Sequence, residues 1–482
     1  MINSRRIINI LGLLVIIEGF FVLFCLPVSF YYGDGDSLAF LITAVVMFAA
    51  GFTAWYFTKD AESSIGKREG FIIVSFVWVL FSVLGSLPFW LSGALPLYTD
   101  AFFETISGFT TTGASILIDV EAMPRGLLLW RSLTQWMGGM GIIVLSLAIL
   151  PVLGIGGMQL FVAEIPGPAK EKLHPRVKQT AQRLWGIYML FTGLEMVLLI
   201  AGGMSIFDAV CHSFTTMATG GYSTKQASIA YFDSGYIQYV ITLFMFIAGT
   251  NFILSYFAIR LRFDKIWKNE EFRFYLGFVL FFTLVFSAGL FLTGGSSAEE
   301  SFRLAAFQVV SIITTTGYVT ADYLLWPPLL SVLIFVLMFF GGSAGSTGGG
   351  VKIIRVLLIM KNSYLEIKRL IYPNAVMPVK LNGRPVSQQI IGNVLAFVFI
   401  YILILGISVV VISSMGYNMD TSFGAAAATL GNIGPGKGLV GPVENFAHFP
   451  DFGKWFLSFL MLLGRLELFT VLVLLAPAFW RK

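Results

Sequence analysis

Residues 100–115 read DAFFETISGFTTTGAS, and three later stretches of the chain repeat the same order of residue types. Those stretches are DAVCHSFTTMATGGYS (208–223), ESFRLAAFQVVSIITTTGYVT (300–320) and DTSFGAAAATLGNIGPG (420–436). Each begins with an acid, continues as a short, weakly apolar helical segment, and ends in a Thr- or Asn-rich turn around glycine. Aligned on Gly113, Gly220, Gly317 and Gly434, the copies lie 107, 97 and 117 residues apart. A second glycine recurs 25 to 30 residues later in each copy, so the sequence predicts an internal repeat of four units.

The segments around these copies are long and apolar. Of the 482 residues, 57% are hydrophobic and 12% are charged, which excludes a soluble multidomain protein and a disordered chain. Two cysteines provide no disulfide framework. Ten apolar runs are long enough to cross a bilayer, which takes about 20 residues. They are 7–30, 38–58, 70–93, 126–150, 184–204, 233–260, 273–294, 325–340 continuing past 350, 389–415 and 454–480.

The basic residues are distributed unequally between the two sides of these runs. Alternating the loops places 24 of the 31 Lys and Arg residues on one side and six on the other, with Arg465 inside a run. The positive-inside rule therefore predicts that both termini are cytoplasmic. The first run is longer than the apolar core of a signal peptide and no cleavage motif follows it, so we expect a retained span.

The four short helical segments are too short to span a membrane, which favours re-entrant helices. We expect Asp100, Asp208, Asp420 and the Glu299/Glu300 pair to cap their outer N-termini, while the negative ends of the helix dipoles attract a cation. Glycine permits positive φ, so successive carbonyl groups of each turn can face a common axis and replace the hydration shell of an ion. A single Gly/Thr turn commonly only joins two spans, but four in register favour one shared site. Units that each cross twice have one orientation, which suits a ring around an axis along the membrane normal.

From about residue 70 onward, the chain resembles the superfamily of potassium transporters that includes TrkH, KtrB and the plant HKT proteins. The resemblance depends on TTTGAS (110–115), ATGGYS (218–223), TTTGYVT (314–320), NIGPG (432–436), the Gly-rich segment 341–350 and Arg465. The two additional spans and the chain length are more similar to the bacterial TrkH branch than to KtrB. The resemblance implies an all-α membrane protein with four parallel span–pore-helix–span repeats in a pseudo-fourfold arrangement around one pore. The expected divisions are two N-terminal transmembrane helices (1–66) and pore repeats at 67–165, 166–265, 266–386 and 387–482.

The resemblance also implies how the ion is bound and which partners the chain has. Carbonyl groups of the four turns would bind K⁺, and Rb⁺ as its analogue; the residues are Thr111, Thr112, Gly113, Ala218, Thr219, Gly220, Thr315, Thr316, Gly317, Asn432, Ile433 and Gly434. These carbonyl groups would form the selectivity filter of the pore. Serine in place of its first glycine is associated with sodium preference in related plant transporters, so Gly113 indicates potassium. A homodimer in the bacterial inner membrane is implied, regulated by a cytosolic nucleotide-binding ring similar to TrkA. No organic cofactor and no nucleic acid partner is expected. The basic stretches 170–183, 260–273 and 352–384 suit lipid headgroups or a partner domain, and the ordinary charge bias of cytoplasmic loops is the alternative explanation.

The Gly-rich segment GGSAGSTGGG (341–350) interrupts an apolar run. A phosphate-binding loop does not fit, because Lys352 precedes Ile353 rather than Ser or Thr and no strand comes before it. A flexible linker is the alternative, but an intramembrane loop beside the pore accounts for the position. We hypothesise that it is a gate formed by Gly341, Gly342, Gly345, Gly348, Gly349, Gly350 and Lys352.

Arg465 lies in the middle of a span, where a charged side chain marks a functional site by default. An ion pair with Glu467 is the structural alternative, but residues i and i+2 of a helix do not face each other. The resemblance places Arg465 below the filter and beside the loop, so it belongs to the proposed gate.

The leading function is therefore K⁺ uptake through a channel-like pore. The alternative is a K⁺ symporter that is driven by H⁺ or Na⁺ and uses alternating access. An intramembrane enzyme would need a carboxylate pair, an HExxH motif or a Ser/His constellation in the spans, and the sequence contains none of these.

Overall fold

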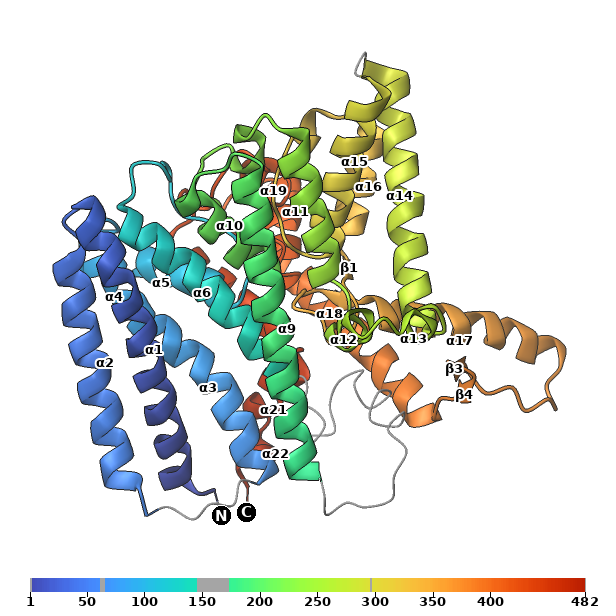
Figure 1. Ribbon diagram of the computed structural model, residues 1–482. Helices are drawn as coiled ribbons and strands as arrows, with labels where there is room; N and C mark the ends of the chain where they lie inside the picture. The colour runs from blue at the N-terminus through green and yellow to red at the C-terminus, as the bar shows by residue number, and fades with distance from the viewer. Residues whose placement is uncertain (1, 61–65, 145–172, 295–296, 482) are drawn as a thin grey trace.

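The computed structural model describes residues 2–60, 66–144, 173–294 and 297–481 of the chain. Within these residues the fold is helical, apart from two pairs of two-residue strands. Two long helices come first, α1 (Ser4–Tyr32) and α2 (Ser37–Thr58), and they pack side by side at one edge of the molecule (Figure 1).

The remaining elements follow in chain order. Residues 67–144 form α3 (Lys67–Gly85), α4 (Leu87–Leu91), α5 (Tyr98–Phe109) and α6 (Arg125–Val144). Residues 173–267 form α9 (Leu173–Ala201), α10 (Ile206–Met217), η2 (Ser228–Tyr231), α11 (Gly235–Ala248), α12 (Phe252–Ile259) and α13 (Phe263–Trp267). The predicted division between residues 265 and 266 falls inside α13, and the one between 165 and 166 lies outside the described residues.

The second half begins with α14 (Glu270–Gly294), α15 (Ala298–Ile313), η3 (Tyr323–Leu325), α16 (Pro328–Leu337), β1 (Phe340–Gly341), β2 (Val351–Lys352), α17 (Ile353–Ile371), β3 (Lys380–Leu381) and β4 (Arg384–Pro385). It ends with α18 (Gln388–Ser413), α19 (Met419–Leu430), η4 (Gly438–Val440), α20 (Asp451–Arg465), α21 (Phe469–Leu475) and α22 (Pro477–Trp480). Strands β1 and β2 pair in parallel, whereas β3 and β4 form an antiparallel pair.

The long helices have the length and composition of membrane spans. Six described helices satisfy both criteria, and two bent pairs, α11 with α12 and α20 with α21, raise the number to as many as eight. The two other predicted runs correspond to α6, which ends at the limit of the described residues, and to α16, which has 10 residues. Interruption of the span after α16 agrees with the predicted break at the Gly-rich segment.

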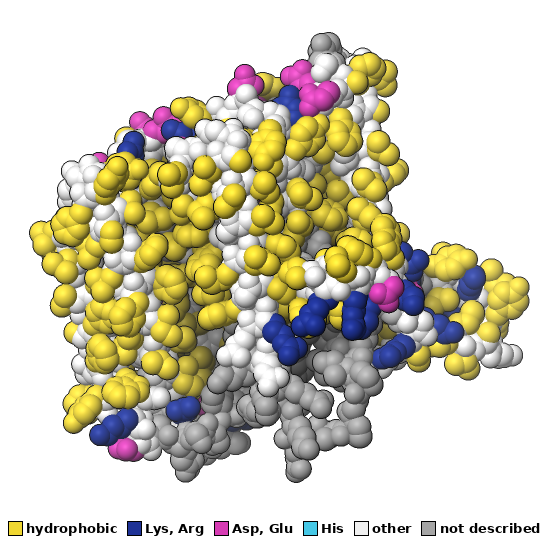
Figure 2. Space-filling model, in the orientation of Figure 1, with side chains coloured by type: hydrophobic (Ala, Val, Ile, Leu, Met, Phe, Trp, Pro, Cys, Tyr) yellow, Lys and Arg dark blue, Asp and Glu magenta, His cyan; other side chains and the backbone are white. Residues whose placement is uncertain are grey.

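The surface has the distribution of side chains that a membrane requires. In Figure 2 a broad apolar band covers the middle of this face, with most acidic side chains along its upper edge and basic side chains mainly below. Large apolar side chains are exposed on the outer helices, including Phe20 on α1, Leu284 on α14 and Phe399 on α18. The chain ends lie together at one end of the molecule (Figure 1), where the Arg68 guanidinium donates to the carbonyl oxygen of Arg481 at 2.9 Å. The ends therefore share one side.

Candidate functional site

Four short helices, α5, α10, α15 and α19, are buried at the centre of the bundle. They have 12, 12, 16 and 12 residues, which is the length expected for re-entrant helices. In α19, residues 425–428 are four consecutive alanines with no exposed surface. Such small side chains let the neighbouring backbone approach closely, which is the packing that membrane helix interfaces favour.

The N-terminal caps of these helices differ from the sequence prediction. Ser205, Ser297 and Asn418 accept hydrogen bonds from backbone amides of the first turn, whereas α5 begins after Leu97 without a side-chain cap. The acids lie inside the first turn instead, at Asp100, Asp208, Glu299, Glu300 and Asp420. There they still complement the positive end of the helix dipole, but they are not the caps.

All four helices end in the same backbone arrangement. In each, the first residue after the C-cap has a left-handed backbone conformation. Its amide donates a hydrogen bond to the carbonyl oxygen three residues earlier, and the next amide donates to the carbonyl oxygen five residues earlier. The amide-to-carbonyl pairs are Thr111–Gly108 and Thr112–Ser107, Thr219–Thr216 and Gly220–Thr215, Thr315–Ile312 and Thr316–Ser311, and Asn432–Thr429 and Ile433–Ala428. This is the Schellman motif, in which a left-handed residue terminates a helix.

The residues at the left-handed position of the motif are not the glycines that usually occupy it. Thr111, Thr219, Thr315 and Asn432 have φ values of 50°, 53°, 58° and 52°. Glycine normally takes this place, and a β-branched residue there is a steric outlier. Such a conformation costs about 1–3 kcal/mol and persists only where the surroundings enforce it, typically at functional sites. Three threonines in one repeated strained position therefore make the turns a candidate site.

The four turns are numbered in chain order, after α5, α10, α15 and α19. The motif also corrects the register of the second of them. The glycines two residues after the left-handed position are Gly113, Gly221, Gly317 and Gly434, with φ between 74° and 95°. Gly221 rather than Gly220 is thus the equivalent of Gly113, and Ala218 is the C-cap of α10. The equivalent triplets are 111–113, 219–221, 315–317 and 432–434, so the predicted second triplet was one residue too early.

The four turns contact one another in a closed cycle. Each of these glycines lies against the carbonyl oxygen of the middle residue of the next turn, and a Cβ there would come too close to it. The pairs, with the glycine first, are Gly113 with Gly220, Gly221 with Thr316, Gly317 with Ile433 and Gly434 with Thr112. The absence of a side chain at these four positions is therefore what allows the turns to meet.

The Gly-rich segment lies directly against the turns. Parallel pairing of Phe340 with Val351 and of Gly341 with Lys352 closes its two ends. The Thr347 hydroxyl lies 3.2 Å from that of Thr219 and 3.1 Å from the carbonyl oxygen of Met217.

The glycines that follow Thr347 continue this contact. The Gly349 amide donates to the Thr315 hydroxyl at 2.6 Å. A Cβ on Gly348 would lie 2.8 Å from the carbonyl oxygen of Thr314, and one on Gly349 would lie 2.7 Å from that of Gly431. The loop thus contacts three of the four turns on the side where their helices end.

The remaining predicted gate glycines shape the loop. Gly345 and Gly350 have positive φ, and Gly345 faces the side chain of Asn251 at the break between α11 and α12. A Cβ on Gly341 would collide with the carbonyl oxygen of Gly349, while one on Gly342 would lie 2.8 Å from that of Gly249. Gly341 and Gly342 therefore permit close backbone contacts, within the loop and with the C-cap of α11 respectively.

Two buried cations hold the loop in place. Arg465 donates to the carbonyl oxygen of Thr347 at 2.6 Å and to that of Gly138 on α6 at 3.3 Å. Lys352 donates its ammonium group to the carbonyl oxygen of Gly348. Glu467 pairs with Arg355 on α17 and not with Arg465, and it lies in the break between α20 and α21 rather than in a helix with Arg465. Arg465 therefore links the loop to the helix that follows the first turn.

Sequence reasoning missed two side chains of the site. Gln135 on α6 donates to the carbonyl oxygen of Gly220 at 2.7 Å and accepts from the amide of Tyr222 at 3.1 Å. Thr347 joins the loop to the turns. Both are polar residues in apolar surroundings, which is a weak signal. Among the described residues no group of three or more His, Cys, Asp or Glu side chains could hold a metal ion, so backbone carbonyls are the main ligands that the turns offer.

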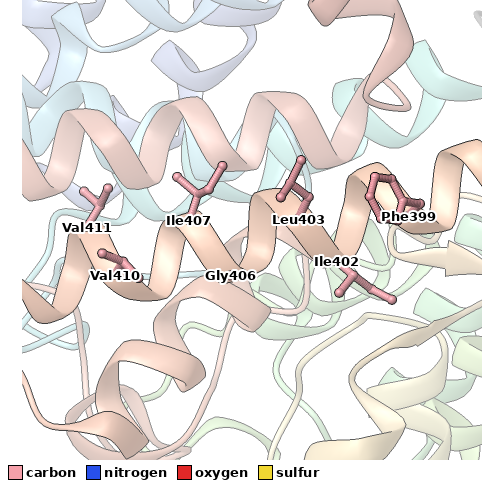
Figure 3. Close-up of a pocket in the computed structure, with 7 residues that line it drawn as sticks. All are labelled: Phe399, Ile402, Leu403, Gly406, Ile407, Val410 and Val411. Atoms are coloured by element: carbon pink, nitrogen blue, oxygen red, sulfur yellow. The ribbon is translucent and has the colours of Figure 1, made fainter.

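A separate apolar groove runs along α18 (Figure 3). Its lining comes from that helix alone, namely Phe399, Ile402, Leu403, Gly406, Ile407, Val410 and Val411. Most of these side chains are exposed on the outer surface, so the groove belongs to the apolar exterior and not to the turns.

Comparisons with known proteins point to a single family. Residues 36–482 match the model of the TrkH family, described as cation transport protein. The chain is 44% identical to the Trk system potassium uptake protein TrkH of Escherichia coli (strain K12), over 100% of both chains. It is 37% identical to TrkG of the same organism, over 100% of this chain and 99% of that protein. The crystal structure of the potassium transporter TrkH from Vibrio parahaemolyticus superposes with a TM-score of 0.91 at 38% identity, covering 100% of both chains.

Proposed function

Because this chain belongs to the TrkH family of cation transport proteins, we propose that it takes up K⁺ through one pore whose selectivity filter is the cycle of four turns. Membership of this family makes it a potassium transport protein of the membrane and not an enzyme. In the proposed arrangement, four parallel span–pore-helix–span units surround the pore in pseudo-fourfold symmetry. Carbonyl groups of residues 111–113, 219–221, 315–317 and 432–434 bind the ion.

The observation that carries this proposal is the closed cycle of glycine-to-carbonyl contacts, together with the identical ends of the four helices. Four helix C-termini directed at one place give it negative potential, which favours a cation. The turns contain no acidic side chain, so the ion would be bound by dipoles and not by a charge. Carbonyl rings of this kind can replace the hydration shell of K⁺ yet still release the ion.

The loop 341–350 is the proposed gate. Thr347, Gly348 and Gly349 lie against the turns, where an ion leaving the filter would pass. Arg465 adds a buried positive charge beside this route and fixes the loop through Thr347. Conduction then requires the loop to move away, and Arg465 and Lys352 stabilise the closed position.

The proposed setting is the bacterial inner membrane, with both termini in the cytoplasm. A homodimer and a cytosolic nucleotide-binding ring similar to TrkA complete the proposed assembly. Helix α17 extends away from the bundle (Figure 1) and begins directly after the loop, so a partner that moved α17 would act on the gate. Its basic side chains, including Lys368 and Arg369, suit an acidic partner surface or lipid headgroups.

Uptake of radioactive Rb⁺ into proteoliposomes that contain the purified chain tests this function. We expect uptake that K⁺ inhibits more strongly than Na⁺ does, without any H⁺ or Na⁺ gradient. Uptake that requires such a gradient would favour the symporter. If folded protein gave no K⁺-sensitive uptake under either condition, the transport proposal would be wrong.

A further inference from the structure

A buried ion pair lies beside the first turn and is not part of the loop contacts. Arg131 on α6 donates through Nε to Glu104 on α5 at 2.5 Å, and the two side chains are 4% and 0% exposed. Arg131 precedes Gly138, the residue that contacts Arg465, by seven positions. At the helical rise of about 1.5 Å per residue it lies about 10 Å away along α6. The pair is therefore on the side of the turns opposite the gate.

Glu104 holds the chain where it leaves the first turn. Its Oε2 accepts a hydrogen bond from the amide of Ile116 at 2.8 Å, and the Ser115 hydroxyl lies 3.2 Å from Oε1. Both residues follow Gly113 closely in sequence. One carboxylate thus fixes the end of the turn against its own pore helix.

Arg131 reaches the second turn with the rest of its guanidinium group. It donates to the carbonyl oxygen of Ser223 at 2.9 Å and lies over the ring of Tyr222, 3.5 Å from its centroid. The Tyr222 hydroxyl in turn donates to the backbone carbonyl oxygen of Glu104 at 2.7 Å. Gln135, one helical turn after Arg131, holds Gly220 from the same helix. The pair therefore connects the first and second turns directly.

Of the four helices that precede the turns, only α5 has a charged side chain at the position of Glu104. The residues seven places before Thr219, Thr315 and Asn432, as Glu104 is before Thr111, are His212, Gln308 and Ala425. His212 repeats part of the pattern, because its Nε2 lies 2.9 Å from the Ser223 hydroxyl and its carbonyl oxygen accepts from Tyr318 at 3.2 Å. The strongest brace is thus confined to the junction of the first two turns.

We propose that Arg131 and Glu104 are positioning residues that set the ion discrimination of the filter by fixing the distance between the first and second turns. The inference rests on the proposed function. A carbonyl ring selects among ions of one charge only if its carbonyls keep their number and spacing. Neutralising one partner leaves the other buried without a counter-charge, so the chain around it must rearrange. Loosened turns can close around Na⁺ or admit water, and discrimination falls while conduction continues.

The experiment compares inhibition of Rb⁺ uptake by K⁺ and by Na⁺ in proteoliposomes of the purified full-length chain. We expect Glu104→Gln and Arg131→Gln to lower the ratio of the Na⁺ to the K⁺ half-inhibitory concentration about tenfold, which equals about 1.4 kcal/mol of discrimination. Arg131→Lys keeps the charge but not the planar fork that reaches both turns, so we expect an intermediate ratio. The matched control is Glu366→Gln on α17, which removes an exposed Glu–Arg pair with Arg369 and should leave the ratio unchanged.

Folding is separated from selectivity with a milder variant. Tyr222→Phe removes one hydroxyl from the same brace, and it decides the question if the charge variants do not fold. A lowered ratio in folded Tyr222→Phe or Glu104→Gln protein supports the inference, and a wild-type ratio in both overturns it. If the wild-type chain itself shows no preference for K⁺, the proposed function fails instead, so the two failures are distinguishable.

Discussion

Removal of Arg465 tests the gate most sharply. Arg465 is 2% exposed, and its guanidinium group donates to the loop carbonyl of Thr347 at 2.6 Å. A hydrogen bond to a charged group contributes about 1.5–3 kcal/mol, and each 1.4 kcal/mol is a tenfold change in an equilibrium. Arg465→Ala should therefore lower the closed-to-open ratio of the loop by about 10- to 150-fold. Loss of the buried positive charge acts in the same direction, because it lowers the barrier for a cation.

The assay is the initial rate of K⁺-sensitive Rb⁺ uptake by purified protein without its regulator. We expect Arg465→Ala to be faster than wild type by one to two orders of magnitude if loop opening limits the rate. Arg465→Lys retains the charge with fewer hydrogen bonds and should lie between them. Arg68→Ala, which removes an exposed arginine at the start of α3 that takes no part in the loop contacts, is the control. A folded Arg465→Ala protein with wild-type or slower uptake would refute the reasoning.

Three further predictions concern the turns and the loop. A Cβ on Gly220 would meet the Gln135 side chain, so in a Gln135→Ala background Gly220→Ala should be tolerated. In the same background Gly221→Ala should abolish uptake, because its Cβ would meet the carbonyl oxygen of Thr316 at positive φ. Uptake by the Gly221→Ala protein together with none by the Gly220→Ala protein would contradict the corrected register. Gly113→Ser would place a Cβ too close to the carbonyl oxygen of Gly220 at positive φ, so uptake should fall and any uptake that remains should prefer K⁺ over Na⁺ less strongly, as the resemblance to plant transporters implies; wild-type uptake with an unchanged preference would count against its place in the filter. Deleting residues 348–350 should raise the uptake rate, since the contacts of the loop with the turns are lost, and lower uptake by folded protein would show that the loop is not a barrier.

Patterns with many independent members could be predicted from the sequence. The four short helices, the long apolar spans and the break after α16 each depend on composition over ten or more residues. The structure has helices at the first two and a non-helical loop at the break. The family resemblance, confirmed by the comparisons, rested on four motifs together. A charge within a span marks a site by default, but only the resemblance placed Arg465 beside the loop, where the structure shows its hydrogen bond to the carbonyl oxygen of Thr347.

Features that depend on one atom or one dihedral angle could not be predicted. Gly220 and Gly221 are adjacent, so spacing alone could not choose between them, and only the left-handed backbone at Thr219 decides. The helix caps were assigned to the acids because both Ser and Asp suit that position. The Glu104–Arg131 pair joins two helices across 27 residues, and no local pattern reports such a contact.

The central claim, that the four turns together form one K⁺ site, is tested most directly by locating a bound ion. Crystals of the full-length chain grown in Rb⁺ should give an anomalous difference peak surrounded by carbonyl oxygens of residues 111–113, 219–221, 315–317 and 432–434. The same peak should disappear when K⁺ replaces Rb⁺. Strong Rb⁺ peaks elsewhere in the protein with none among the turns, in protein that transports Rb⁺, would contradict the account.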